Sequence, residues 1–541
     1  MSVEPGVTHV GADVLLVEPT GSGVPMRTVI LGASLGTVFE WYDFFVYGTL
    51  AGVLGPLFFP PALGEVGGFL AGIATYLAGL AIRPLGALVF GGMGDGVGRK
   101  KTFLVTIVIM GCCTALVGVL PTYGAVGIMA PIALVALRCV QGLAMGGEYG
   151  GAATYVAEHA PPGGRGYATG WIQMTATAGF FLSLAAVLIC ETGLGADAFR
   201  TWGWRLPFLF SLVLLAVSVW IRLRLDESPV FIAMKAEGRA SKTPVRESLC
   251  SMANVKLMLL VLFGMVGGTG IIWYTAQFYA LIFITKSLRI APHTAYLIMA
   301  CGLALSAPFF LVFGRLSDRI GRKLPMMTAM VLAIATYFPI YHALMHFGNP
   351  RLEAAIAHAP VTVQSNECVL RFFSGPQNDC ERVSEFLNAA GIPHERKALQ
   401  SNQGVVTSVS GQSVIGFEPS RLHDQLVRAG YPEKADPQEV NFPAMVLLVA
   451  LLMLYVCMSY GPMAAYLTEM FPSRIRYTSL SLPYHIGLGY FGAFMLYFST
   501  LISTQTGDVF AGLYYPLGIA LVTLLIGLPF LPETKDRDIR L

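Results

Sequence analysis

The chain has 541 residues, of which 55% are hydrophobic and only 12% are charged, with a formal net charge of +3 at pH 7. Soluble proteins carry roughly 25% charged residues, so this composition excludes an ordinary soluble protein and predicts that most of the chain lies in a lipid bilayer. A net charge this small on so long a chain creates no strong field for a polyanion, so no nucleic-acid partner is expected.

The first segment of the chain has no targeting pattern. Residues 1–26 contain no Lys or Arg, whereas a secretory signal peptide begins with basic residues and continues into an apolar core and a cleavage site. We therefore expect residues 1–27 to form a cytoplasmic tail.

Twelve stretches are long and apolar enough for a helix that crosses about 30 Å of hydrocarbon, which needs roughly 20 residues. Their centres lie near positions 39, 81, 111, 141, 179, 214, 271, 304, 334, 455, 490 and 520. With the N-terminus inside, the short outer loops hold four basic residues, namely Arg200, Arg205, Lys286 and Arg289. Most other basic residues then lie inside, so the positive-inside rule predicts that both termini are cytoplasmic.

Two pairs of segments indicate an internal repeat. GGMGDGVGRK at 91–100 and GRLSDRIGRK at 314–323 share Gly, Asp, Gly, Arg and Lys at the same five places. YVAEHAPPGGR at 155–165 and YLTEMFPSRIR at 466–476 share Tyr, Glu, Pro and Arg. The offset between copies is 223 residues in the first pair and 311 in the second, so 88 residues are inserted between the two markers of the second half.

These features define the expected organisation: a cytoplasmic tail at 1–27, an N-terminal six-helix half at 28–225, a cytoplasmic linker at 226–255, helices seven to nine at 256–345, an extracytoplasmic insert at 346–441, helices ten to twelve at 442–531 and a cytoplasmic C-terminus at 532–541.

The repeated charged turn resembles the signature loop of the major facilitator superfamily. The first helix (GASLGTVFEWYDFFVYG), the second (RPLGALVFGGMGD) and the fourth (RCVQGLAMGGEYGGAATYVAEHAP) are similar to its metabolite:proton symporter branch, as are LDESPVF at 225–231 and LPETK at 531–535. Members of that branch move α-ketoglutarate, citrate, shikimate, proline or glycine betaine. The resemblance implies an all-α membrane protein of twelve helices in two six-helix halves, which alternate access to a site near the midplane.

In such a fold the charged turns are expected to lock helix ends together on the cytoplasmic face and to open when the halves rock. The predicted gating residues are Asp95, Arg99, Lys100, Asp318, Arg319, Arg322, Glu158 and Glu469. The alternative is that each turn is an ordinary solvated loop. Gly96 stands where the family has Arg and where the second copy has Arg319, which predicts a looser first lock.

Ionisable groups at membrane depth are costly, so each is a functional hypothesis. Glu40 and Asp43 are three residues apart in the first helix and share a face with Tyr47. Two carboxylates this close do not ionise together readily in a low dielectric, which makes the pair a candidate for proton coupling. The alternative is that one of them ties the first helix to Arg83 or Arg138.

Arg83 and Arg138 are candidates for capture of a carboxylate, because a guanidinium binds it through two hydrogen bonds. Arg138 and Gln141 also match a fourth-helix motif of the family in which the arginine is implicated in proton coupling, and Arg83 has a structural role as its alternative. Glu148 lies ten residues beyond Arg138, roughly 15 Å along a helix, and is a second coupling candidate rather than a partner of that arginine.

The seventh helix carries IIWYTAQFYA at 271–280. Tyr274 and Gln277 are three residues apart there and form a polar face that lipid would penalise, so we expect them, with Tyr47, to contact substrate. Aromatic residues in a membrane helix also serve packing or the interface belt, which is the alternative for Tyr274.

The insert alternates extended segments (VTVQ, CVLRFF and GVVTSV) with helical ones (CERVSEFLNAAG and SRLHDQLVRAG), which predicts a small α/β module. Its GQSVIGFEPSRLHDQL segment resembles the tail of glutaredoxin-like proteins, but the insert has no CxxC motif and no redox activity is expected. A disulfide between Cys368 and Cys380 is one expectation in an oxidising compartment, and two free thiols are the other. The module's ligand or partner is not indicated.

We therefore predict a monomeric secondary transporter in the bacterial inner (plasma) membrane that imports a small organic anion, a carboxylate metabolite, together with protons. The alternatives are a zwitterion porter for osmolytes such as proline or betaine, and a transporter-derived sensor that uses its insert. No metal, cofactor or enzymatic activity is expected, because the chain has no phosphate loop, metal-ligand cluster or paired nucleophile and base.

Overall fold

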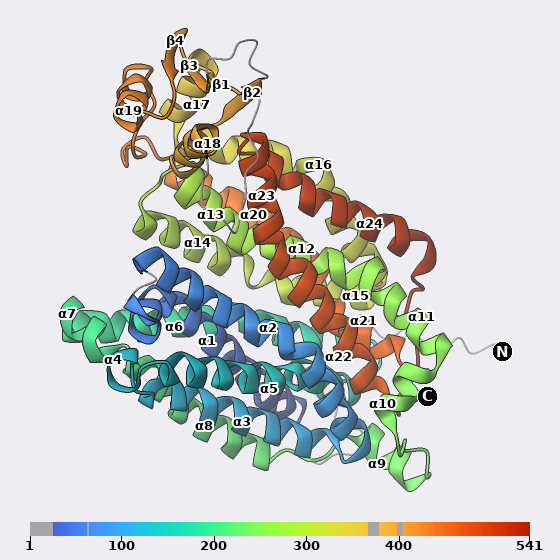
Figure 1. Cartoon of the computed structure of the whole chain (residues 1–541). Helices are drawn as coiled ribbons and strands as arrows, with labels where there is room; N and C mark the ends of the chain where they lie inside the picture. The colour runs from blue at the N-terminus through green and yellow to red at the C-terminus, as the bar shows by residue number, and fades with distance from the viewer. Residues whose placement is uncertain (1–24, 62–63, 366–377, 398–403, 541) are drawn as a thin grey trace, which may run out of the picture.

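A computed structural model describes residues 25–61, 64–365, 378–397 and 404–540. Within these residues, twelve helical spans are long and apolar enough to cross a membrane, from Met26–Leu50 to Ala511–Phe530. Each span contains one of the twelve predicted centres, so the predicted number of helices is confirmed. Figure 1 shows the helices gathered into two bundles, with the small sheet at one end of the molecule.

The first bundle is the N-terminal half. Its helices are α1 (Met26–Phe58), α2 (Gly64–Gly96), α3 (Arg99–Val119), α4 (Tyr123–Val126), α5 (Met129–His159), α6 (Arg165–Leu194), α7 (Ala196–Ala198), the π-helical turn η2 (Phe199–Gly203) and α8 (Arg205–Leu223). Two short helices follow in the linker, α9 (Pro229–Ala236) and α10 (Pro244–Cys250).

The C-terminal half repeats this arrangement around the insert. Its seventh to ninth spans contain α11 (Met252–Val261), η3 (Leu262–Val266), α12 (Gly267–Tyr274), η4 (Thr275–Tyr279), α13 (Ala280–Ile282), η5 (Phe283–Ser287), α14 (Pro292–Ser306), α15 (Phe309–Ile320) and α16 (Lys323–Gly348). Its last spans contain α20 (Phe442–Tyr460), α21 (Met463–Met470), α22 (Arg476–Ile486), η6 (Gly487–Gly492), α23 (Ala493–Thr506), the 3₁₀ turn η7 (Ala511–Leu513) and α24 (Tyr514–Phe530).

The seventh span is interrupted by three π-helical turns, η3, η4 and η5, and the eleventh by one, η6. Such turns insert a residue into the regular ladder of hydrogen bonds and occur often at functional sites. The sequence did not predict them, because hydrophobic periodicity does not distinguish one π turn in a long apolar helix.

The insert is a small α/β module, as predicted. It consists of α17 (Pro350–His358), β1 (Val361–Gln364), α18 (Asp379–Ala389), β2 (His394–Lys397), β3 (Val406–Val409), β4 (Gln412–Ile415) and α19 (Pro419–Arg428). The strands form one sheet in the order β2-β1-β3-β4, in which β1 pairs parallel with β2 and antiparallel with β3. Of the predicted segments, VTVQ is β1, GVVTSV contains β3, and CVLRFF lies outside the described residues.

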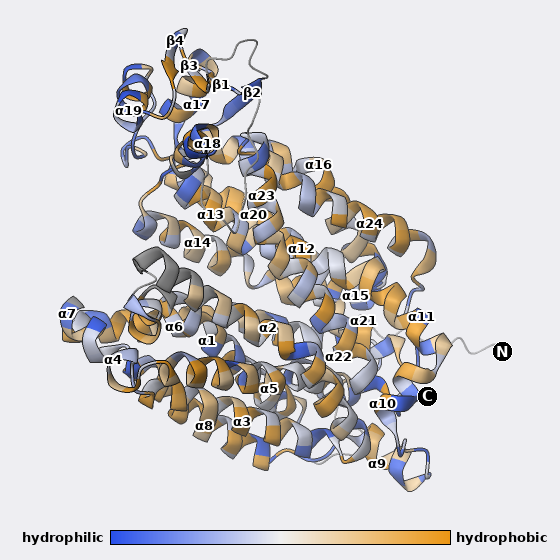
Figure 2. Cartoon of the chain, in the orientation of Figure 1, coloured by the Kyte–Doolittle hydropathy of each residue, from blue (hydrophilic) through white to orange (hydrophobic). Residues whose placement is uncertain are grey.

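Glycines let the second and fourth spans approach at backbone distance. A Cβ atom on Gly142 would lie 2.0 Å from the carbonyl oxygen of Gly79, and one on Gly86 would lie 1.9 Å from that of Leu143. Only glycine fits these crossings, which is the physical use of small residues between membrane helices. Large apolar residues are exposed along the helices of both bundles, where lipid would contact them. In Figure 2, which is coloured by hydropathy, hydrophobic residues predominate along the helices, and hydrophilic residues are concentrated in the insert and at the ends of the helices.

Candidate translocation site and the contacts that close it

Two small cavities of about 20 Å³ each adjoin one another and share Phe44, Leu80 and Arg83. The first lies between the halves and is lined by Glu40, Trp41, Phe44, Leu80, Arg83, Trp273, Tyr274, Tyr484, His485, Leu488 and Gly489. The second lies within the N-terminal half and is lined by Asp43, Phe44, Gly79, Leu80, Arg83, Arg138, Gln141, Gly142 and Met145. A cavity of this size holds about one water molecule, so neither has room for a larger molecule in this structure.

Glu40 and Arg83 line the first cavity without ionic partners among the described residues. Glu40 is 5% exposed and has no hydrogen bond there. Arg83 is half-buried, with Nη2 at 3.4 Å from the sulfur of Met145 and its guanidinium 5.6 Å from the ring centre of Phe44. Its buried Nε has no acceptor. One carboxylate and one guanidinium therefore line the same cavity, each without an ionic partner among the described residues.

Asp43 and Glu40 do not form a pair of carboxylates on the wall of the first cavity. Its Oδ2 lies 3.2 Å from Nη1 of Arg138, and its Oδ1 accepts hydrogen bonds from Thr114 and Gln141 at 2.8 and 3.1 Å. The guanidinium of Arg138 also lies 3.6 Å from the ring centre of Tyr47. Asp43, Arg138, Gln141 and Tyr47 thus form one network inside the N-terminal half, which is the predicted alternative for one of the two acids. Their roles in coupling and substrate binding stay predictions.

Glu148 pairs with an arginine that sequence analysis did not single out. Arg222, in the last turn of α8, forms an ion pair with Glu148 and donates to the Phe103 carbonyl at 2.6 Å. Thr106 donates to Glu148 at 2.9 Å. Arg222 is 1% exposed, because α8 packs against α3 and its guanidinium reaches Glu148 on α5. Sequence analysis did not select it, because this burial depends on packing between helices distant in the chain.

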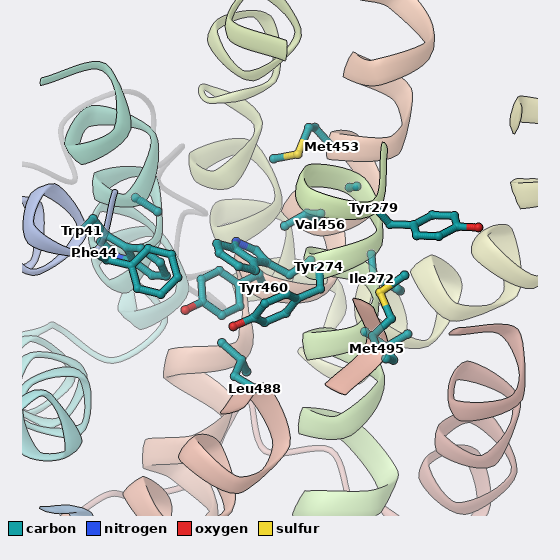
Figure 3. Close-up of a cluster of buried hydrophobic side chains, with 14 of the residues drawn as sticks. Trp41, Phe44, Ile272, Tyr274, Tyr279, Met453, Val456, Tyr460, Leu488 and Met495 are labelled. Atoms are coloured by element: carbon teal, nitrogen blue, oxygen red, sulfur yellow. The ribbon is translucent and has the colours of Figure 1, made fainter. Parts of the chain in front are cut away.

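Aromatic side chains form the walls of the first cavity. Trp41 of α1 and Trp273 of α12 meet across the two halves, with ring centres 5.4 Å apart. Figure 3 shows this cluster, in which Trp41 and Phe44 approach from α1 and Tyr274 from α12. Tyr274 lines the cavity, whereas Gln277 is buried in η4 and is not among the lining residues. The predicted contacts of both residues with substrate stay predictions.

Three tyrosines from two halves form a second aromatic group beside the cavity. The rings of Tyr149 on α5 and Tyr484 on α22 are parallel within 4°, with centres 3.6 Å apart. Tyr460 on α20 shares a hydrogen bond of 2.5 Å with the Tyr484 hydroxyl. Sequence analysis did not select Tyr149 or Tyr460, because tyrosines in apolar helices are common and their spacing gave no sign of this contact.

The first charged turn joins the two halves at one end of the molecule, which we call the motif face and define by residues 91–100 and 314–323. Asp95 accepts hydrogen bonds from the backbone N–H groups of Tyr477 and Thr478 at 3.2 and 2.9 Å, where α22 begins. Arg99 lies 3.1 Å from Asp95 and donates to the Ser473 carbonyl at 2.8 Å. The first turn therefore binds the start of a helix in the opposite half.

The second turn makes the corresponding contacts. Asp318 accepts hydrogen bonds from the N–H groups of Gly166 and Tyr167, both at 2.8 Å, where α6 begins. Arg322 lies 2.5 Å from Asp318 and 3.0 Å from Glu469. Each predicted turn thus binds the first residues of a helix in the other half.

Glu158 and Glu469 connect these turns to further arginines across the halves. Arg476 lies 2.9 Å from Glu158, which is 3.4 Å from Arg99. Arg165 lies 3.4 Å from Glu469. The two arginines occupy equivalent places at the end of the repeated YxxExxPxxxR segment, so the sequence repeat carried their signal, although it did not reveal their partners.

The turn glycines have a backbone reason. Gly98 and Gly321 have φ values of 137° and 102°, which residues other than glycine rarely adopt. Gly94 lies against the Tyr477 ring, where a Cβ atom would come within 2.1 Å. The first turn has Gly96 where the second has Arg319. The side chain of Arg319 is exposed and forms no ion pair with a described residue, so its absence from the first turn removes no ion pair there.

Lys100 and two glutamates complete the turns. Nζ of Lys100 donates to the Leu223 carbonyl at 3.2 Å. Glu227, from LDESPVF, accepts hydrogen bonds from the N–H groups of Arg99 and Lys100, and Glu533, from LPETK, accepts those of Arg322 and Lys323. Burial raises the pKa of Glu533, but its backbone N–H donors lower it more, so the net pKa is below the usual value. Both family marks therefore act as caps on the helices that follow the turns.

One predicted feature of the insert, the disulfide, lies partly outside the described residues. Cys380 is buried in α18 and disulfide-bonded, while Cys368 is not described, so the pairing of these two cysteines stays a prediction. His394 in β2 is also buried, and burial lowers its pKa to about 4. It is therefore neutral at neutral pH.

Comparisons with known proteins agree with this fold. The profile of the sugar (and other) transporter family matches residues 29–260. The chain aligns along 95% of its length with a solved structure of the major facilitator superfamily proton:xylose symporter XylE bound to 6-bromo-6-deoxy-D-glucose, with a TM-score of 0.64 at 16% identity over 98% of that chain. This likeness shows the fold, in which two repeated six-helix halves are joined at one face.

Relatives found by sequence have a higher identity to this chain than the solved structure has. The chain is 36% identical to the glycine betaine/proline/ectoine/pipecolic acid transporter OusA of Dickeya dadantii over 310 residues, 55% of this chain and 60% of that one. It is 36% identical to the proline/betaine transporter of Escherichia coli K12 over 331 residues, 58% of this chain and 65% of that one. These two alignments thus span less than two thirds of the relatives' own length.

A third relative is covered more fully. The shikimate transporter of Escherichia coli K12 is 35% identical over 326 residues, which are 59% of this chain and 72% of that one. The chain therefore belongs to the major facilitator superfamily, in its branch of metabolite transporters. Its relatives are named as transporters, and its twelve candidate spans are those of a multi-pass membrane protein.

Proposed function

We propose that the chain imports a small carboxylate-containing metabolite by proton symport, with Arg83 binding the carboxylate and Glu40 carrying the proton. The observation that supports this most directly is that both groups line one cavity between the halves and have no ionic partner among the described residues. The guanidinium of Arg138 is already engaged by Asp43, so Arg83 is the better candidate for the solute.

The low dielectric of this cavity gives the proposed coupling its physical basis. A carboxylate that is removed from water without a partner takes up a proton more readily. Without substrate, the positive charge of Arg83 favours the ionised form of Glu40. When a substrate carboxylate binds the Arg83 guanidinium, this stabilisation of the Glu40 charge is lost. Protonation of Glu40 then removes the repulsion between two carboxylates, so substrate and proton bind more tightly together than separately.

A second candidate substrate class is a zwitterion such as betaine or proline. Trp41, Trp273, Tyr274 and Phe44 surround the cavity, and aromatic faces bind quaternary ammonium groups. The same Arg83 then binds the carboxylate of the zwitterion. The names of the betaine and proline relatives favour this class, and the name of the shikimate relative favours a plain organic acid.

We further propose that the motif face is cytoplasmic, with both termini there, and that the insert projects from the opposite face of an inner (plasma) membrane. The distribution of basic residues supports this orientation. An external pH below the internal pH would then drive protonation from outside, so uptake rises as the external pH falls.

The test is uptake into proteoliposomes with an imposed proton gradient, measured for labelled shikimate, citrate, α-ketoglutarate, proline and betaine with and without a protonophore. We expect one of these solutes to accumulate and the protonophore to abolish its accumulation. Glu40→Gln is expected to retain exchange of labelled for unlabelled solute while losing gradient-driven accumulation.

The matched control is Glu191→Gln, which changes an exposed glutamate at the far end of α6 and should transport as the parent protein does. Accumulation that persists in Glu40→Gln would remove that residue from the coupling role. If no solute in the panel enters vesicles that contain folded protein, the carboxylate class itself is wrong.

A further inference from the structure

The insert is fixed to the C-terminal half at several points. The N–H of His394 donates to the Gly507 carbonyl at 2.9 Å, and the side chains of Asn388 and Arg396 donate to the Thr504 carbonyl at 3.3 and 3.0 Å. Thr504 lies in the last turn of α23, whose carbonyls lack partners within the helix. The insert therefore caps the outer end of the eleventh span.

A cavity of about 360 Å³ lies at this junction. Its lining residues come from the end of the seventh span, from the α18–β2 segment of the insert and from the end of the eleventh span: Tyr279, Ile282, Phe283, Lys286, Ser287, Asn388, Gly391, Ile392, Thr500, Ser503, Thr504, Gly507 and Val509. None of them lines either central cavity. Sites for small molecules have volumes of about 300–1,000 Å³, mostly apolar walls and a few polar groups.

The charges at this cavity favour an anion. Lys286 lines it, and Arg396 lies at its edge through Thr504; neither forms an ion pair with a described residue. Nε of Arg396 is buried without an acceptor, and burial lowers the pKa of this guanidinium. Among the acidic neighbours, Glu395 pairs with Lys397 at 2.9 Å. Asp508 accepts the Phe510 N–H at 2.9 Å and keeps its charge, so the two basic side chains outnumber the one carboxylate without a cationic partner among the described residues.

We propose that this cavity is a second binding site, separate from the translocation site, for a small organic acid with an apolar body. Its carboxylate is bound by Lys286 and Arg396, and the side chains of Phe283 and Ile392 pack against its apolar part. The ligand would bridge the insert and the outer ends of two spans of the C-terminal half. This gives the extra residues of the insert a role in sensing an extracytoplasmic acid.

The test uses the full chain in lipid nanodiscs and labelled benzoate as the probe, with equilibrium dialysis to count the molecules bound per chain. Empty nanodiscs and labelled benzamide correct for partition into lipid and for binding without a charge. We expect Lys286→Gln combined with Arg396→Gln to weaken one class of bound benzoate at least about tenfold, as the loss of a charge-assisted contact implies. Thr500→Trp, which fills the cavity from the exposed side of α23, should have the same effect.

Two matched controls keep the outcome specific. Arg421→Gln changes an exposed arginine of the insert that pairs with Glu418, and Thr506→Trp adds the same bulk to an exposed residue outside the lining. Both should bind benzoate as the parent chain does. Benzoate binding that is absent from the parent chain, unchanged in the two cavity variants, or reduced equally in the controls overturns the proposal.

Discussion

The Asp43–Arg138 pair is a buried ion pair inside the N-terminal half. Asp43 is completely buried, and Arg138 is 5% exposed. Three neighbours bond to the Asp43 carboxylate, and the Tyr47 ring covers the guanidinium. Removing one partner from a buried pair costs about 3–5 kcal/mol, because the remaining charge is left unpaired.

Asp43→Asn is therefore expected to lower the free energy of unfolding by about 3–5 kcal/mol. Thermal unfolding of the purified protein in detergent measures the loss. Combining Asp43→Asn with Arg138→Gln should recover most of the Tm, because no unpaired charge then remains. If Asp43→Asn keeps its Tm but uncouples uptake from the proton gradient, the pair has a coupling role and not a structural one.

Residue identity indicated which side chains line the first cavity better than it indicated their partners. Glu40, Arg83 and Tyr274 were selected because polar groups in apolar helices need a reason, and all three line that cavity, while their functional roles stay predictions. The partner of each charge could not be read in the same way. The contact of Glu148 with Arg222 depends on how α5 and α8 pack, and a change of one helical turn moves a side chain by about 5 Å.

Among the elements, α5 and α22 contact each other across the two halves beside the first cavity. The Tyr149–Tyr484 stack joins the two halves, and Gln173 donates to the Tyr149 hydroxyl at 2.8 Å. An aromatic pair contributes about 0.5–1.5 kcal/mol beyond the area it buries. Its loss is sufficient to change the ratio of two conformations several-fold.

Tyr484→Ala is expected to increase the population that is open at the motif face by about threefold to tenfold. Tyr484→Phe keeps the stacked ring and loses only the hydrogen bond to Tyr460, so its effect should be smaller. A cysteine at Ser481, which is buried against Gly150, reports the opening through its rate of maleimide labelling once the exposed native cysteines are replaced. Equal labelling rates in the alanine variant and the parent would exclude the stack as a gate.

Long elements were predictable and short ones were not. Each membrane span has its own apolar run of about 20 residues, so a single sequence contains the signal for all twelve. The four-residue strands β2 and β4 have charged or polar residues at most positions and depend on pairing with β1 and β3. Their formation is decided by contacts distant in the chain, which local patterns do not contain.

At the scale of the whole molecule, the two locks are equivalent by the internal repeat. Each motif carboxylate accepts two backbone N–H groups at the start of a helix in the opposite half, where the helix dipole also favours a negative charge. Among the described residues, the insert is held by hydrogen bonds to the C-terminal half, at Arg289, Phe347, Thr504 and Gly507. The halves can therefore rock with the insert attached to one of them.

If the locks are equivalent, Asp95→Asn and Asp318→Asn should shift the conformational equilibrium in the same direction. Each variant replaces charge-assisted hydrogen bonds, which contribute about 1.5–3 kcal/mol each, by weaker neutral ones. We expect each to favour the state that is open at the motif face by about tenfold or more, and the double variant to add the two effects because the sites are separate.

Spin labels at exposed positions measure this shift through distances between the halves. Labels at Val97 and Ile320 report the motif face, and labels at Ile128 and Tyr296 report the opposite ends of the bundles. The first distance should lengthen and the second shorten in each variant, whereas Glu237→Gln, which breaks an exposed ion pair in the linker, should change neither. A shift in only one of the two aspartate variants would mean that a single turn carries the closure and that the other, despite its matching sequence and contacts, serves only to cap its neighbouring helix. The alternation of access would then depend on an asymmetric gate rather than on the repeat.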